Sequence, residues 1–159
     1  MARRMKLNQD NYYSEKANKQ YFSVSQYKDF MKCEAMAMAK ISGSYKPEVT
    51  KALLTGSFVD SYFEGTLEQF IKENPAVFTR KQELKSEFRK ANEIIARIRN
   101  DELFMRFMSG EKQRIMTFEL FGVPWKMKMD SYLPDICITD LKVVANFRTL
   151  LLWRYDLQG

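Results

Sequence analysis

Over the first two thirds of the chain, apolar residues recur every three or four positions, a spacing that predicts helices. Residues 1–22 are polar and rich in tyrosine, and we expect an irregular N-terminal arm there. Ser23 then precedes an apolar stripe and is a candidate N-cap for a helix that fades near Gly43. A second helix is expected over about 48–70, with Gly65 as the point where it ends or weakens.

The third predicted helix has the clearest apolar stripe, and a continuation of it stops near Ser109 and Gly110. Beyond residue 113 the period falls to two, and β-branched and aromatic residues become frequent. This alternation predicts strands over 113–121, 124–132 and 136–144, with turns around Gly122 and Pro134. Helices followed by a small sheet predict an α/β domain over 23–159. The residues that form the apolar stripe of the third predicted helix are Leu84, Phe88, Ala91, Ile95 and Ile98.

Composition narrows the chemistry that this chain can perform. It holds 26 Lys and Arg against 20 Asp and Glu, a formal charge of +6, which fits a polyanionic partner or an ordinary basic protein. The absence of histidine excludes Ser-His-Asp catalysis and zinc sites built with imidazole. Two distant cysteines and no secretory or membrane-spanning segment predict a reduced, cytoplasmic protein without an iron–sulfur cluster.

The second and third predicted strands carry the candidate chemistry. Side chains alternate along a strand, so Lys126, Lys128 and Asp130 share one face, and Asp140 and Lys142 share a face of the next strand. A tight reversal at Pro134 would bring Asp130, Asp140 and Lys142 together. Two carboxylates in that arrangement suit one Mg²⁺, and the lysine could orient a water or stabilise developing charge.

A plainer interpretation of the same residues stays open. Asp-Leu-Lys is a common tripeptide, and an Asp–Lys ion pair at a strand edge would also explain it. Against this, Asp140 lies inside the apolar run 136–144, where a charge is costly unless it is paired or binds a metal.

The segment from Gly122 to Asp130, followed by Ile138-Thr139-Asp140-Leu141-Lys142, resembles the active-site hairpin of PD-(D/E)xK nucleases. It is most similar to phage recombination exonucleases of the RecE and lambda-exonuclease kind. Val143 and Val144 stand where those families have two threonines. Residues 21–27 also resemble the opening serine-rich helix start of these families.

Two further segments resemble these families. Residues 54–60 are similar to a Gly-Thr-x-x-His helix, with Asp60 at the histidine position, and Glu64 one turn further is a weaker alternative. Residues 155–159 resemble the start of a Gln-x-x-x-Tyr helix containing Gln158. The chain ends before that tyrosine, so we expect a domain that is incomplete at its C-terminus.

The resemblance implies a restriction-endonuclease-like core and a metal-dependent exodeoxyribonuclease acting on linear double-stranded DNA. It assigns catalysis to Asp130, Asp140 and Lys142, and Mg²⁺, or Mn²⁺ in its place, to Asp60, Asp130, Asp140 and the Leu141 carbonyl. Lys126 and Gln158 are the candidate DNA contacts. A single-strand annealing protein and a second copy of the chain are the further partners it implies, and no membrane. The rival hypothesis is a non-catalytic DNA- or protein-binding domain with a relic site.

Overall fold

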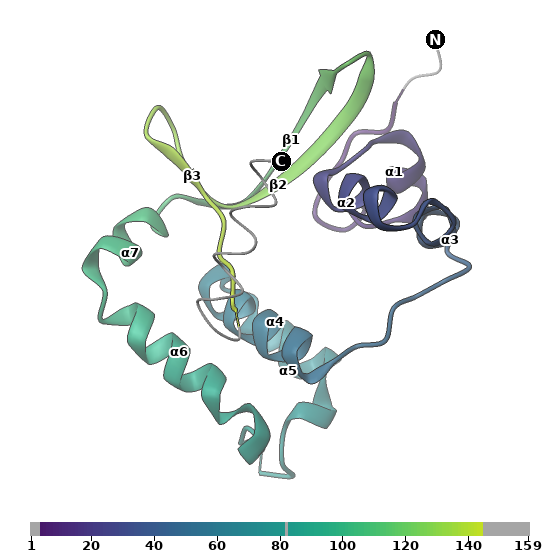
Figure 1. The fold of residues 1–159 in the computed structure, drawn as a ribbon. Helices are drawn as coiled ribbons and strands as arrows, with labels where there is room; N and C mark the ends of the chain where they lie inside the picture. Colours follow the sequence, from purple (N-terminus) through teal and green to yellow (C-terminus); the bar gives the residue numbers. More distant parts are fainter. Residues whose placement is uncertain (1–3, 82, 145–159) are drawn as a thin grey trace. The chain divides into compact units, whose positions relative to one another are not determined.

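The computed structural model describes residues 4–81 and 83–144 (Figure 1). The chain divides into two compact units. The first combines Met1–Glu48 with Glu111–Tyr132, and the second combines Val49–Gly110 with Leu133–Gly159. Within the described ranges, no helix is long and apolar enough to cross a membrane.

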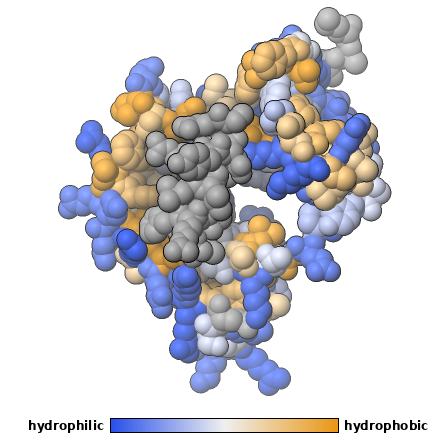
Figure 2. Space-filling model, viewed as in Figure 1, coloured by the Kyte–Doolittle hydropathy of each residue, from blue (hydrophilic) through white to orange (hydrophobic). Residues whose placement is uncertain are grey.

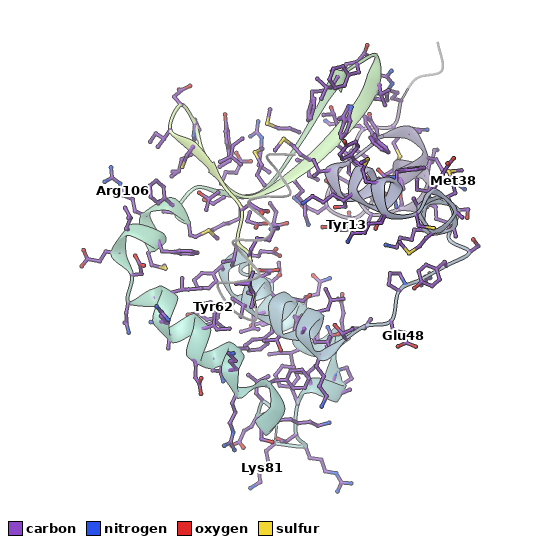
Figure 3. All side chains as sticks on the ribbon, viewed as in Figure 1. Tyr13, Met38, Glu48, Tyr62, Lys81 and Arg106 are labelled. Atoms are coloured by element: carbon purple, nitrogen blue, oxygen red, sulfur yellow. The ribbon has the colours of Figure 1, made fainter. Side chains whose placement is uncertain are left out.

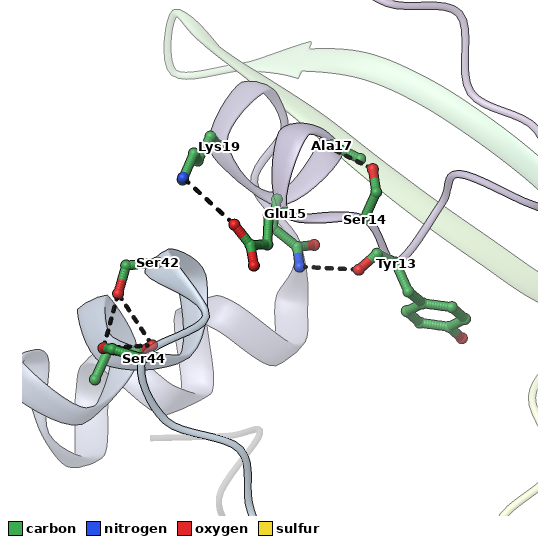
Figure 4. Close-up of polar contacts among 9 residues, drawn as sticks. Tyr13, Ser14, Glu15, Ala17, Lys19, Ser42 and Ser44 are labelled. Carbon is green, nitrogen blue, oxygen red and sulfur yellow. Dashed lines mark hydrogen bonds and ion pairs between the residues drawn. The ribbon is translucent and has the colours of Figure 1, made fainter.

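The first unit begins with a helix that the sequence analysis did not predict. Helix α1 (Glu15–Gln20) lies within the stretch expected to be an irregular arm, and that expectation was wrong for these residues. The Oγ of Ser14 accepts a hydrogen bond from the Ala17 amide at 3.2 Å, which caps the helix (Figure 4). Glu15 and Lys19 form an ion pair one turn apart. One buried alanine, Ala17, gave too weak an apolar stripe to mark so short a helix.

The predicted helix after Ser23 is present, but it is divided. Helix α2 (Val24–Lys32) is capped by the Oγ of Ser23, which accepts from the Gln26 amide at 3.3 Å as predicted. Helix α3 (Glu34–Ser42) follows after a break at Cys33, whose backbone is extended. Gly43 ends α3 in the left-handed region, where glycine has no steric cost.

Strands β1 (Glu111–Leu120) and β2 (Val123–Leu133) form an antiparallel hairpin, close to the predicted bounds. Phe121 and Gly122 at its tip both have positive φ, as the two-residue turn of a tight hairpin requires. Phe118 pairs with Trp125 across the strands, and the two rings stack. Figure 2 shows hydrophobic residues gathered at this tip, where Phe121 is 90% exposed.

The segment before α2 is held against the hairpin by main-chain hydrogen bonds. The Phe22 amide donates to the Pro124 carbonyl, and the Lys126 amide donates to the Phe22 carbonyl, each at 2.8 Å. Beneath this bridge the ammonium of Lys126, whose residue is 3% exposed, donates to the Tyr12 carbonyl at 2.5 Å and to Asn18 Oδ1 at 2.7 Å. Lys126 therefore joins residues 12–18 to the face of β2.

This buried pair of side chains predicts how stability depends on pH. Burial lowers the pKa of Lys126 to about 8 and, with the neighbouring Tyr13, raises the pKa of Tyr12 to about 12. Between pH 8 and 10.5 the unfolded chain holds a proton on Lys126 that the folded chain has released, so the free energy of unfolding should rise with pH. Above pH 10 the unfolded chain loses the Tyr12 proton first, so stability should fall.

Urea unfolding of the wild type and Lys126→Met at pH 7.5, 9, 10 and 11 tests this expectation. The wild type should gain stability between pH 8 and 10, by at most about 1.4 kcal/mol per pH unit from this one proton. The variant should lack that part of the gain. Equal slopes in the two proteins would show that Lys126 does not titrate in this range.

The second unit is mainly helical. Helices α4 (Lys51–Glu64) and α5 (Leu67–Glu73) replace the single helix predicted over 48–70, and they are separated at Gly65, which has φ of 79°. Short 3-10 turns η1 (Pro75–Val77) and η2 (Ser86–Phe88) precede α6 (Arg89–Arg99) and α7 (Glu102–Phe107). The buried core of the unit comprises Phe58, Val59, Phe63, Phe70, Ala91, Ile95, Met108 and Leu141.

Two of the predicted elements in this unit are shorter than expected. The third predicted helix begins as α6 at Arg89, because Leu84 forms a β-bridge with Phe78 instead. The predicted strand 136–144 is only β3 (Cys137–Thr139). The tight reversal before it is confirmed: the Ile136 amide donates to the Leu133 carbonyl at 3.1 Å, with Pro134 at the second position and Asp135 at φ 59°.

Candidate active site

Asp130 lies half-buried on β2 in the first unit, beside an unusual residue of β1. Gln113 is 8% exposed and has φ of 54°, a left-handed conformation that costs energy for a residue with a side chain. Its Nε2 lies 3.4 Å from Asp130 Oδ1, and its carbonyl accepts a hydrogen bond of 2.6 Å from Gln9 Nε2. The unusual backbone at Gln113 therefore brings an amide donor to the Asp130 carboxylate.

Lys112 is the cation next to this carboxylate. Burial lowers the pKa of the Lys112 ammonium, and the charge of Asp130 opposes this by raising it. Asp130 therefore has an amide donor and a cation beside its carboxylate, and carboxylate oxygens are the ligands that a hard divalent cation prefers.

We expect Gln113 to orient Asp130. Gln113→Leu removes the amide donor at similar volume, and it should weaken divalent-cation binding by about 10- to 100-fold, the usual effect of losing a group that positions a metal ligand. Gln9→Leu, which removes the hydrogen bond to the Gln113 carbonyl, is the matched control and should have a smaller effect. Isothermal titration with Mn²⁺ measures both. Unchanged affinity in Gln113→Leu would contradict the orienting role.

Lys126 was predicted to contact DNA, and the structure places its ammonium on the acceptors of Tyr12 and Asn18 instead. The predicted polar face of β2 does exist, but residues 12–18 cover one end of it. A DNA contact by Lys126 stays a prediction, and it would require the ammonium to leave two hydrogen bonds.

Asp140 and Lys142 lie together in the second unit. The Nζ of Lys142 is 2.7 Å from Asp140 Oδ2, and both side chains are about half exposed, at 55% and 52%. Leu141 between them is 7% exposed and belongs to the hydrophobic core. The backbone beyond Thr139 is not a strand, yet Leu141 faces inward and its two charged neighbours face solvent. The expectation that Asp140 lies in a buried strand was wrong.

Asp60 lies on α4, the helix that packs against this segment. A Cβ added to Gly56 would lie 3.9 Å from Val143, so this side of α4 faces Val143. Asp60, one turn further, projects from the same side, is half-buried, and has a solvent-shielded Oδ1. Glu64, the weaker alternative, accepts a hydrogen bond from Thr66 at 3.3 Å.

The second unit therefore holds three of the predicted residues: Asp140 and Lys142 form an ion pair on either side of Leu141, and Asp60 lies on the side of α4 that faces Val143. The carboxylate oxygens of Asp60 and Asp140 fit a hard cation such as Mg²⁺ by type. Asp130 belongs to the first unit, and Gln158 lies outside the described residues. In residues 4–81 and 83–144, no three Asp, Glu or Cys side chains form a group that could by itself hold a metal.

Sequence reasoning missed three residues around these sites, Gln113, Tyr12 and Asn18. The tyrosine-rich composition of residues 1–22 was the only sequence signal for the last two. For Gln113 the alternating pattern gave no signal, since neither its left-handed backbone nor its hydrogen bond from Gln9, 104 residues away in the chain, is encoded in local spacing.

The family profile described as a PDDEXK-like domain of unknown function (DUF3799) matches residues 23–158. The chain belongs to this PDDEXK-like family. The match confirms both the resemblance to PD-(D/E)xK nucleases and the α/β, restriction-endonuclease-like fold class. A comparison with curated proteins finds no match.

A crystal structure from Eubacterium rectale is similar over almost the whole chain. The protein in that crystal structure is named as an exonuclease, an activity that is inferred for it. The sequences are 52% identical, the TM-score is 0.83, and the match covers 98% of this chain and 65% of that one. This member of the PDDEXK-like family thus spans 65% of the length of that relative.

Proposed function

We propose that this chain is a metal-dependent nuclease domain that hydrolyses phosphodiester bonds of DNA. The observation that carries the proposal is the Asp140–Lys142 pair at 2.7 Å, held on both sides of the buried Leu141 beside the Asp60 side of α4. Family membership adds support, because an acid, one residue and then a lysine is the pattern for which the PD-(D/E)xK class is named.

In this proposal each residue has a distinct task. Asp60 and Asp140 would hold a divalent cation through carboxylate oxygens, with the Leu141 carbonyl as a further ligand, and the family resemblance assigns Asp130 to the same role. The bound cation would lower the pKa of a water and neutralise charge on the phosphate. Lys142 places its ammonium next to Asp140, where it can orient the attacking water or stabilise the developing oxyanion. The core contacts of Leu141 fix the backbone between Asp140 and Lys142 and so keep these two side chains close together.

We further infer an exonuclease acting on linear double-stranded DNA in phage-type recombination, with Mg²⁺ as the cation and Mn²⁺ as a substitute. Support comes from the inferred activity of the Eubacterium rectale protein and from the sequence resemblance described above. A single-strand annealing protein as recipient of the product and a second copy of the chain are further partners in this proposal.

A non-catalytic domain is the second candidate. It is favoured by the same ion pair, because two half-exposed opposite charges at 2.7 Å satisfy each other without a cation. The two candidates differ in the partner of the Asp140 carboxylate. The nuclease requires this carboxylate to bind a metal, whereas the non-catalytic domain keeps it paired with the Lys142 ammonium.

The test uses linear and covalently closed duplexes of one sequence, incubated with the chain in Mg²⁺, Mn²⁺ or EDTA. We expect nucleotides to be released from the linear duplex in either metal and none in EDTA. Release from the closed circle at the same rate would contradict the exonuclease assignment. No release from either substrate would favour the non-catalytic domain.

A further inference from the structure

We propose that Tyr13 and Lys128 form a platform that binds one nucleotide of a single DNA strand next to Asp130. The proposal rests on the proposed nuclease function for its choice of ligand. The Lys128 ammonium lies 4.8 Å from the centre of the Tyr13 ring and 5.7 Å from that of Tyr12. Tyr13 is 70% exposed, whereas Tyr12 is buried at 7%. The cluster thus presents one aromatic ring and one cation to solvent.

The platform is built on fixed supports. The rings of Tyr12 and Tyr13 meet edge to face at 4.9 Å. Beneath them the buried Lys126 binds the Tyr12 carbonyl and lies 4.6 Å from the centre of its ring. The Asn18 side chain bridges the two, donating to the Tyr13 carbonyl at 3.4 Å and accepting from Lys126. An exposed tyrosine with this much support loses little conformational entropy on binding a ligand.

Figures 3 and 4 show the direction of the exposed ring. Tyr13 extends from the loop before α1 and points away from the helix that Ser14 caps. Tyr12 and Lys128 contact this ring, and Tyr13 is still 70% exposed, so the side chain is accessible to a planar ligand.

The platform has a defined position relative to the predicted metal ligand. Lys128 and Asp130 are two residues apart on β2 and share a face, so their Cα atoms are separated by about 7 Å. A DNA strand whose reacting phosphate lies at Asp130 would bring a neighbouring nucleotide to Lys128 and Tyr13. The Lys128 ammonium would pair with a phosphate, and the Tyr13 ring would stack on a base.

The paired chemistry favours nucleic acid over a peptide or a lipid surface. Every base has a face that stacks on an aromatic ring, and every nucleotide carries an anionic phosphate. The formal charge of +6 supports attraction of a polyanion. A single strand is favoured over a duplex, because only unpaired bases expose their faces to a tyrosine.

Binding of a fluorescent single-stranded oligonucleotide, measured by anisotropy in EDTA so that metal-dependent cleavage is excluded, tests the platform. Tyr13→Ala and Tyr13→Leu should weaken binding by roughly 5- to 150-fold, the effect of losing one stacked base, while Tyr13→Phe should bind as the wild type does. Lys128→Gln should reduce the slope of log affinity against log salt by about 0.7, the value for one phosphate of a single strand. Tyr27→Ala and Lys32→Gln, on α2, are matched surface controls and should have little effect.

The outcomes separate this proposal from the nuclease proposal. Wild-type affinity in Tyr13→Ala, or an equal loss in Tyr27→Ala, overturns the platform even where the chain cleaves DNA. Preferential duplex binding that does not depend on Tyr13 also overturns it. Conversely, Tyr13-dependent binding by a chain that releases no nucleotides in Mg²⁺ supports the platform and contradicts the nuclease.

Discussion

Replacing Lys142 by alanine is expected to slow DNA cleavage by about 10²- to 10⁴-fold, the usual contribution of a positioned acid–base group. DNA affinity should change little, because Lys142 is held 2.7 Å from Asp140 rather than presented alone to phosphate. The defect should therefore lie in kcat, with KM nearly unchanged.

The matched control is Lys72→Ala, which removes an exposed lysine from α5 in the same unit. It should cleave at the wild-type rate. Single-turnover cleavage in Mg²⁺ and binding in EDTA separate chemistry from affinity. A Lys142→Ala variant that cleaves normally would show that the assignment of the catalytic lysine is wrong, and one that loses affinity instead would make Lys142 a DNA contact.

Features set by a few adjacent residues could be predicted from the sequence. The cap at Ser23, the break at Gly65 and the reversal at Pro134 each depend on local backbone preferences, and all three were found at the expected positions. The alternation along β2 also identified which side chains share a face. Short-range patterns therefore predicted correctly where this cap, this break and this turn lie along the chain.

The alternating pattern could not predict which residues cover each face of a strand. Lys126 is buried because Tyr12 and Asn18, more than a hundred residues away in sequence, accept its hydrogen bonds. The apolar run after Thr139 suggested a long strand, but only Leu141 is buried while its neighbours are exposed. In both places tertiary contacts decided the burial of a charge, and no local spacing encodes such contacts.

The ion pair between Asp140 and Lys142 also predicts the pattern of metal binding. In Mn²⁺ titrations, Asp140→Asn should weaken binding at least about tenfold, because it replaces an anionic oxygen ligand with a neutral amide. Lys142→Ala should instead preserve or tighten binding. Removing the lysine frees Asp140 from a competing exposed pair worth about 0–1 kcal/mol, equivalent to at most about a fivefold gain.

Asp135→Asn is the matched control for the loss of a carboxylate. Asp135 is exposed in the turn before β3 and has φ of 59°, a conformation that asparagine also tolerates, so this change should leave both the fold and Mn²⁺ affinity intact. Opposite effects of Asp140→Asn and Lys142→Ala are expected only where Asp140 changes partner from the lysine to the metal. Equal Mn²⁺ affinity in the wild type and Asp140→Asn would show that Asp140 is not a metal ligand and that it serves only in the ion pair with Lys142.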